Sequence, residues 1–170
     1  RIRDVNGIGE PVEATEPLEV KFPNNAVSFS DIQLVESYTK TEMPGSLSKG
    51  GYDLIPHIND VFVKDETKLI FYSEIYQTLT FLGEGKKYLC NFFLRNSNTN
   101  EQLTSYSGFT RYTASEVSVL MKEFDITNLP TGQYNLELEV RDAENQVLAT
   151  KKVSFVRSNP GEIIAPDDYT

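Results

Sequence analysis

The chain has 170 residues, and 16 Lys plus Arg against 25 Asp plus Glu give it a formal net charge of −9. A hydrophobic fraction of 39%, with 9 Tyr and 10 Phe, can build a core in one domain or two very small ones, so wholesale disorder is excluded. The acidity argues against nucleic-acid binding, the single Cys excludes an internal disulfide, and one His with one Cys leaves no conventional zinc ligand set.

The two ends of the chain differ in composition from its middle. Residues 1–26 are rich in Glu and are interrupted by Gly and Pro, which predicts an extended lead-in. Residues 158–170 carry Pro160, Gly161 and Pro166 and predict a linker or tail. We therefore expect one domain at residues 27–157, as a module of a longer protein.

The first half of this body predicts three strands. The apolar pattern of residues 27–38 changes phase near Asp31, which predicts a strand with a β-bulge there. Residues 52–58 predict a short strand that Pro56 confines to a sheet edge. Residues 68–80 are apolar on both parities, which predicts a central strand covered on both faces, although periodicity alone leaves a short helix open.

The second half of the body alternates apolar and polar residues more clearly. The strands predicted from this pattern are residues 86–95, 103–113, 117–126, 134–141 and 147–156. Tyr134, Leu136, Leu138 and Val140 fall on one face of their strand, which places them in the core. Asn145 tolerates a left-handed conformation, so we expect a hairpin turn there.

Seven to eight short strands without an amphipathic helix predict an all-β fold, specifically an immunoglobulin-like antiparallel β-sandwich. The segment at residues 129–134, Leu-Pro-Thr-Gly-Gln-Tyr, is similar to a tyrosine corner, in which the Tyr hydroxyl bonds an upstream backbone group. With no disulfide, packing must hold the sheets together. The expected centre of the core is Phe71, Phe92, Tyr134 and Leu136.

A resemblance to a known family extends over most of the body. The segments that carry it, in chain order, are residues 30–34, 51–56, 69–76 and 129–134. Together they resemble the β-sandwich region that precedes the GWxTD module in a family of secreted bacterial proteins. The GWxTD motif itself is absent from this sequence. The resemblance implies an extracytoplasmic protein and transfers no catalytic residue.

Residues that could carry chemistry are few. His57 is the only histidine and has no recognisable partner pattern, so we interpret it as a residue at a strand edge and expect no catalytic site. Cys90 lies in an apolar strand and is interpreted as a small core residue. Residues 83–87 lack the spacing of a phosphate-binding loop, so Gly83 and Gly85 are interpreted as hairpin turn residues.

Acidic residues near two loops raise the question of calcium. They are Asp60, Asp65 and Glu66 at one loop, and Asp142 and Glu144 at the last hairpin. Calcium needs six to eight oxygens around one point, and no Asp-x-Asp-x-Asp-Gly loop is present. We interpret these acids as a solvated surface and predict no metal site and no cofactor.

The segment at residues 105–112 holds the candidate binding residues Tyr106, Arg111 and Tyr112. Strand parity puts the two tyrosines on one face and Phe109 on the other. If the tyrosines faced outward, they would form a platform able to stack on a sugar ring. If they faced inward, they would cover the core with their hydroxyls at its rim.

The sequence thus predicts a non-catalytic, extracytoplasmic module that contacts another protein or acts as a spacer between neighbouring modules. Sandwich edges accept additional strands, which makes the segment at residues 52–58 the expected contact. The alternative function is glycan binding through the tyrosine platform. We expect no nucleic-acid partner, and no apolar run approaches the roughly 20 residues that a membrane span needs.

Overall fold

The computed structural model of the chain describes residues 26–161. The predicted lead-in up to residue 25 and the predicted tail from residue 162 onward lie outside the described residues. The described part folds into eleven strands and one short helix. They are β1 (Ser28–Phe29), β2 (Gln33–Lys40), β3 (Ser48–Lys49), β4 (Tyr52–Pro56), β5 (Val61–Val63), β6 (Lys68–Tyr76), α1 (Thr78–Leu82), β7 (Lys87–Asn96), β8 (Gln102–Thr113), β9 (Val117–Asp125), β10 (Gly132–Arg141) and β11 (Val147–Ser158).

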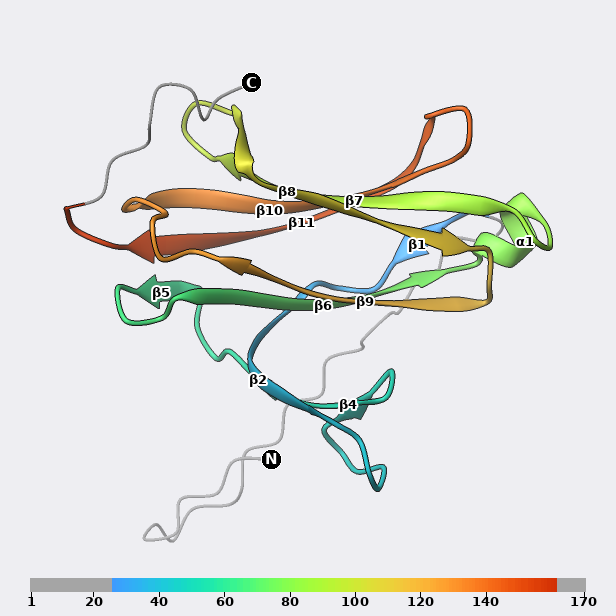
Figure 1. Cartoon of the computed structure of the whole chain (residues 1–170), viewed down its shortest axis with the longest axis horizontal. Helices are drawn as coiled ribbons and strands as arrows, with labels where there is room; N and C mark the ends of the chain where they lie inside the picture. The colour runs from blue at the N-terminus through green and yellow to red at the C-terminus, as the bar shows by residue number, and fades with distance from the viewer. Residues whose placement is uncertain (1–25, 162–170) are drawn as a thin grey trace, which may run out of the picture.

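The strands form two curled sheets that face each other (Figure 1). One sheet has the pairing order β1-β6-β2-β4-β3. In it, β1 and β2 pair with one edge of β6, and β9 pairs with the other edge. The other sheet has the order β5-β11-β10-β7-β8. All neighbouring strands are antiparallel except β5 and β11. The prediction of an all-β fold is confirmed.

The main core lies between the two sheets. Alternation in β10 buries Tyr134, Leu136, Leu138 and Val140 completely, as predicted. Aromatic rings fill the centre, where the ring centroids of Phe71 and Phe92 are 5.8 Å apart. All four residues expected at the centre of the core are buried, and so is the Cys90 side chain.

β6 is covered on both faces, as its sequence predicted. Leu69, Phe71 and Ile75 contribute to the main core, whereas Ile70 and Tyr72 enter a second cluster on the outer face. The strand ends at Tyr76, although its apolar pattern predicted a continuation to residue 80. Gln77 adopts a left-handed φ of 65° that ends the strand, and α1 follows. Because a helix precedes Gly83 and Gly85, their turn is not the predicted hairpin turn.

The predicted irregularity near Asp31 is present. Phe29 pairs with Ile75 and Gln33 pairs with Tyr72, so the N-terminal segment holds one more residue than β6 between these pairs. β2 also has a second irregularity, between Val35 and Ser37, that the sequence did not predict.

The position predicted for the strand at residues 52–58 is only partly correct. β4 lies between β2 and β3 and is therefore not the outermost strand. β3 is so short that it pairs only with Tyr52 and Asp53. Among the described residues, the end of β4 at Ile55 and Pro56 pairs with β2 alone.

A buried hydrogen bond fixes the start of β10. The Tyr134 hydroxyl donates to the Pro130 carbonyl at 3.0 Å, which confirms the contact that the sequence predicted. Gly132 makes room for this ring, since a Cβ atom there would lie 3.0 Å from the Tyr134 hydroxyl oxygen.

Arg157 of β11 is fully buried and joins three parts of the chain. Its Nη1 donates to the carbonyls of Val63 at 2.6 Å and Glu66 at 2.8 Å, in the turn between β5 and β6. Nη2 reaches the Lys64 carbonyl at 3.3 Å, and Nε reaches the Leu129 carbonyl, before β10, at 3.4 Å. The planar guanidinium thus ties β11 to two loops that are distant in sequence.

We expect Arg157→Lys to lower the free energy of unfolding by about 2–4 kcal/mol, because an ammonium group cannot reach all four carbonyls and leaves some buried without a donor. Because the chain has no Trp, urea unfolding followed by far-UV circular dichroism measures the change. Arg111→Lys on the exposed face of β8 is the matched control and should change stability by less than about 0.5 kcal/mol. Equal unfolding midpoints for the two variants would refute a structural role for Arg157.

Candidate functional site

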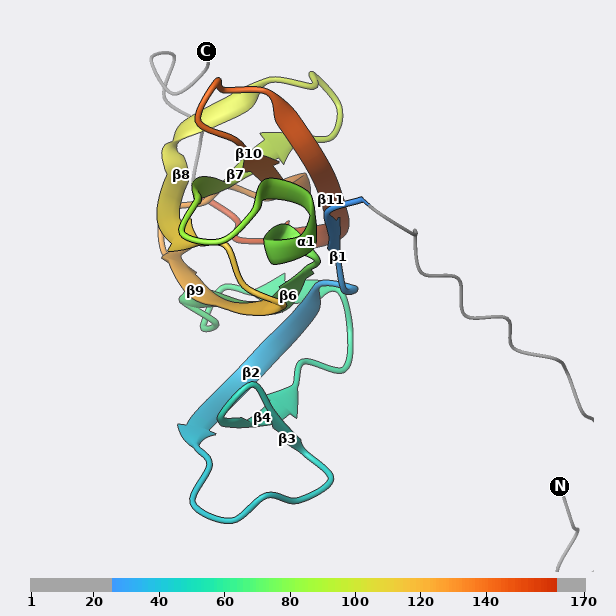
Figure 2. The ribbon, with the colours of Figure 1, turned by 90° about the vertical axis from the view of Figure 1, so that its right-hand side faces the viewer.

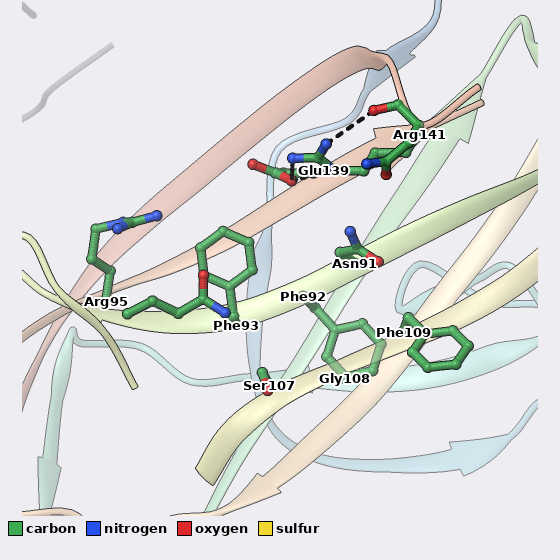
Figure 3. A pocket seen from close by; sticks show the side chains of 11 residues that line it. Asn91, Phe92, Phe93, Arg95, Ser107, Gly108, Phe109, Glu139 and Arg141 are labelled. Atoms are coloured by element: carbon green, nitrogen blue, oxygen red, sulfur yellow. Dashed lines mark hydrogen bonds and ion pairs between the residues drawn. The ribbon is translucent and has the colours of Figure 1, made fainter. Parts of the chain in front are cut away.

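The outer face of the five-stranded sheet carries an open hollow of about 760 Å³ (Figure 3). β7, β8 and β10 contribute most of its lining. The lining residues are Asn91, Phe92, Phe93, Arg95, Gln102, Ser107, Gly108, Phe109, Glu139, Arg141 and Asn145. This volume lies within the range of small-ligand sites in proteins.

Two arginines in the hollow are held in place. Arg141 donates from Nε and Nη2 to Glu139 Oε2 at 2.9 and 2.7 Å, and from Nη1 to the Asn145 carbonyl at 3.1 Å. Arg95 donates to Glu137 Oε1 at 3.1 Å and lies with its Cζ atom 5.3 Å from the Phe93 ring centroid. Fixed planar polar groups of this kind hydrogen-bond a ligand without first being ordered.

An aromatic ring lies across β7 from Glu139, since Phe109 pairs with Asn91 and Asn91 pairs with Glu139. Phe109 is 64% exposed, and it lies next to Ser107 and Gly108 on β8. Gly108 pairs with Phe92, and a Cβ atom at Gly108 would lie 2.6 Å from Phe92 Cε2, so only glycine lets the core ring lie across β8. The hollow therefore combines one exposed apolar ring with mostly polar walls.

The structure separates the three binding residues that the sequence singled out. Tyr106 is buried, and Tyr112 packs on the core with its hydroxyl donating to the Val119 carbonyl at 2.9 Å. Arg111 is exposed on the face of β8 opposite the tyrosines, which is the outer face that carries Phe109, but it does not line the hollow. The two tyrosines thus share a face, as predicted, but that face is the core side and offers no platform.

Sequence reasoning missed the hollow and its residues. Strand parity places Phe109 on the face opposite the tyrosines. A prediction that the tyrosines face the core would therefore also have predicted an exposed Phe109 ring. The alternation of β10 places Glu139 and Arg141 on the face opposite its core residues, and by itself it indicates no binding role for them. The two side chains share the outer face of β10 and form an ion pair there, and the Asn145 carbonyl in the following turn accepts a further hydrogen bond from Arg141.

A second feature is an arm, residues 36–58, built from β2, β3, β4 and their connections. Figure 2 shows the arm reaching away from the two facing sheets. Leu54 buries its side chain with Val35, Ile70 and Tyr72 on the outer face of β6, which anchors the base of the arm. Gly50 sits against Tyr72 as well, and a Cβ atom there would lie 2.4 Å from its hydroxyl oxygen.

The rest of the arm exposes apolar side chains. Its large exposed hydrophobic residues are Tyr38, Met43, Leu47, Ile55 and Ile58, of which Ile58 is 95% and Met43 is 84% exposed. An isolated hairpin is only marginally stable in water. Apolar side chains that are exposed together on such a hairpin are typical of a contact surface.

The arm also has an open strand edge. β2 pairs with β6 only at residues 33–35, and beyond them the described residues pair it with β4 alone. The Leu54 N–H donates to the Leu47 carbonyl and therefore points away from β2. Tyr38 is the residue of β2 directly opposite Leu54, so its backbone N–H and C=O point away from β4 in the same way. Alternation directs the same groups of Lys40 to this open edge.

His57, at the end of the arm, takes part in a small polar cluster. Its Nδ1 lies 2.6 Å from the Asn59 carbonyl and its Nε2 lies 2.7 Å from Glu66 Oε1, while its ring stacks on Phe62 with centroids 4.2 Å apart. Both partners are acceptors, so both ring nitrogens donate in the protonated imidazolium. This cluster lines a hollow of about 260 Å³ that also contains Glu36.

The cluster shifts both pKa values. Burial of the ring lowers the pKa of His57, but the bonds to Glu66 and Asn59 and the negative charges nearby outweigh burial and raise it above its usual 6.5. Burial likewise raises the pKa of Glu66, and its bonds to His57 and to the Val63 N–H outweigh that effect and lower it. The ion pair is therefore the favoured state around pH 6.

We expect this pair to make stability depend on pH. The raised pKa of His57 gives a stabilisation that is complete below about pH 6.5 and is lost as the pH rises through the folded-state pKa. The lowered pKa of Glu66 gives a stabilisation that is present above about pH 4.5 and is lost on acidification. Urea unfolding of the wild type and of His57→Asn should show a difference that shrinks between about pH 6 and about pH 9. A pH-independent difference would contradict this linkage.

The described residues contain no group of three or more His, Cys, Asp and Glu side chains that could hold a metal ion. Two of the acidic residues near the two loops have other partners. Glu66 binds His57, and the Asp142 carboxylate accepts the backbone N–H groups of Glu144 and Gln146. Within residues 26–161, no helix is long and apolar enough to cross a membrane.

Comparisons with known proteins give little further information. No protein-family model matches the sequence, and no curated protein matches it. Among solved structures, the chain is similar to the putative ApaA protein from Bordetella pertussis, at 8% sequence identity. The match covers 82% of this chain and 99% of that chain with a TM-score of 0.27, a value too low to carry an inference.

Proposed function

We propose that the chain is an immunoglobulin-like β-sandwich that works as a non-catalytic contact module. The fold assignment is supported by the pairing of β6 with β9 opposite a sheet of order β8-β7-β10-β11. The hydrogen bond from Tyr134 to Pro130, at the start of the penultimate strand, is the second support.

The single observation that carries the function is the arm. It combines exposed apolar side chains with an open β2 edge, and strand addition to such an edge is a recurring mode of polypeptide recognition. We therefore propose that the arm binds another polypeptide strand. The proposed setting, an exported bacterial protein with further modules, rests on the resemblance to the region that precedes the GWxTD module.

Two residues support the non-catalytic part of the proposal. Both ring nitrogens of His57 are hydrogen-bonded, one to Asn59 and one to Glu66. The protonated imidazole therefore has no lone pair with which to act as a base. Burial of Cys90 raises the pKa of its thiol to about 12, which disfavours the nucleophilic thiolate.

Site-specific photo-crosslinking tests the contact. With a photoreactive residue at Ile55, in cells that produce the protein, we expect adducts with a polypeptide. The same residue at Phe81, an exposed apolar position on α1, is the matched control and should give none. Lys40→Pro, which removes an N–H from the open edge, should reduce the adducts at least fivefold, whereas Lys40→Ala should retain them. Equal adducts from Ile55 and Phe81 would reject the arm as the contact.

A second candidate function is glycan binding in the hollow of β7, β8 and β10. The observation that favours it is the exposed Phe109 ring, which lines the same hollow as the fixed side chains of Arg141 and Glu139. The ring can stack on the apolar face of a pyranose, and the planar polar groups can bridge adjacent hydroxyls.

Calorimetry with neutral oligosaccharides tests this second function. We expect Phe109→Ala to weaken binding at least tenfold, because it removes the stacking surface and leaves the polar groups in place. Phe81→Ala removes an exposed Phe elsewhere and should bind as the wild type does. Absence of heat with every oligosaccharide tried would end the proposal.

A further inference from the structure

The contact at the end of the arm depends on one proton. The His57 ring lies between two acceptors, with the Asn59 carbonyl 2.6 Å from Nδ1 and Glu66 Oε1 2.7 Å from Nε2. An imidazolium donates to both acceptors, whereas a neutral imidazole carries a single N–H. When His57 loses its proton, one of the two acceptors therefore faces a lone pair at hydrogen-bonding distance.

The surroundings of the ring leave little room for water to replace the lost bond. The His57 side chain is only 8% exposed, and its ring is stacked on Phe62 with an angle of 12° between the two planes. A buried acceptor without a donor is costly, and the face of an aromatic ring favours a cation over a neutral partner. The neutral ring is thus less stable in this position than the protonated ring is.

The charges on the neighbouring elements act in the same direction. Glu36 of β2 and Lys68 of β6 line the hollow at His57, but the Lys68 ammonium donates to a carboxylate on β9 at 2.8 Å. Arg157 of β11 bonds the Glu66 carbonyl and not its carboxylate. Burial of the ring disfavours the imidazolium, and the carboxylates of Glu66 and Glu36 favour it.

The position of His57 in the chain couples this contact to the arm. The first strand of the arm, β2, is fixed to β6 by pairing up to Val35, and the His57 N–H donates to the Leu34 carbonyl at 3.0 Å. The His57 side chain is what joins residues 55–58 to the turn between β5 and β6. Without it, the hydrogen bonds that the described residues give to residues 55–58 come from β2 alone.

We propose that His57 is a proton-operated clamp at the base of the arm. The protonated ring holds residues 55–58 to the turn between β5 and β6, and deprotonation releases them. The consequence for binding rests on the proposed function, in which the arm receives a polypeptide strand. A strand edge that is already held in place binds with a smaller ordering cost, so the closed clamp favours binding.

Amide hydrogen exchange at about pH 6 and about pH 9, by rapid mixing and expressed as protection factors, tests the clamp. We expect peptides that cover residues 55–60 to lose about tenfold in protection at the higher pH, as the loss of one buried hydrogen bond predicts. Peptides from β10 should keep theirs. His57 is the only histidine, and burial raises the pKa of the Cys90 thiol to about 12, so neither a second imidazole nor this thiol titrates in between.

Glu66→Gln gives the sharper test, because it should reverse the response. The carboxamide oxygen can accept the Val63 N–H that Glu66 Oε2 now accepts at 2.7 Å, and its NH₂ can donate to Nε2 of the neutral ring. Residues 55–60 should then be better protected at pH 9 than at pH 6. Glu144→Gln removes the same charge from an exposed side chain of the last hairpin and should respond as the wild type does.

His57→Asn should abolish the pH response, and circular dichroism should show that each variant is folded. Equal protection of residues 55–60 in the wild type at the two pH values, or the same response in Glu66→Gln as in the wild type, would overturn the clamp. Exchange needs no partner, so it decides the clamp even if the Ile55 adducts of the proposed function do not form. Conversely, adducts together with unchanged exchange would reject the clamp and leave the proposed function standing.

Discussion

The buried guanidinium of Arg157 is the constraint on which the arrangement of the loops depends. A cation inside a protein is costly unless each of its donors finds an acceptor, and here backbone carbonyls supply them. Those carbonyls belong to the turn between β5 and β6 and to the loop before β10. Satisfying one side chain therefore fixes where β6 begins relative to β10 and β11.

This constraint reaches the arm through the same turn. Glu66 gives its backbone carbonyl to Arg157 and its carboxylate to His57, which ends the arm and stacks on Phe62. The other end of the arm leaves β6 after Val35. The arm is thus held at both ends by buried contacts while its middle stays exposed. A strand edge presented in this way binds without a large ordering cost.

The parts of the fold that the sequence predicted are those in which local pattern has one physical solution. Strict alternation in β10 allows only one face to be buried, and Tyr134 beside Pro130 and Gly132 specifies a contact within five residues. The apolar residues on both parities of β6 required two covered faces, and the structure supplies one on each side. Asn145 likewise has the left-handed φ, 64°, that its turn predicted.

The all-β class, most strands and the centre of the core follow from the amino-acid pattern alone, because side-chain periodicity is a local property. The face of β8 that lies inside follows only from the packing of the two sheets, since periodicity separates Tyr106 from Phe109 without saying which of them meets the other sheet. The tertiary structure also decides the roles of Arg157 and of the β2 edge. Both depend on chain segments far apart in sequence, which meet only when the two sheets close on their common core.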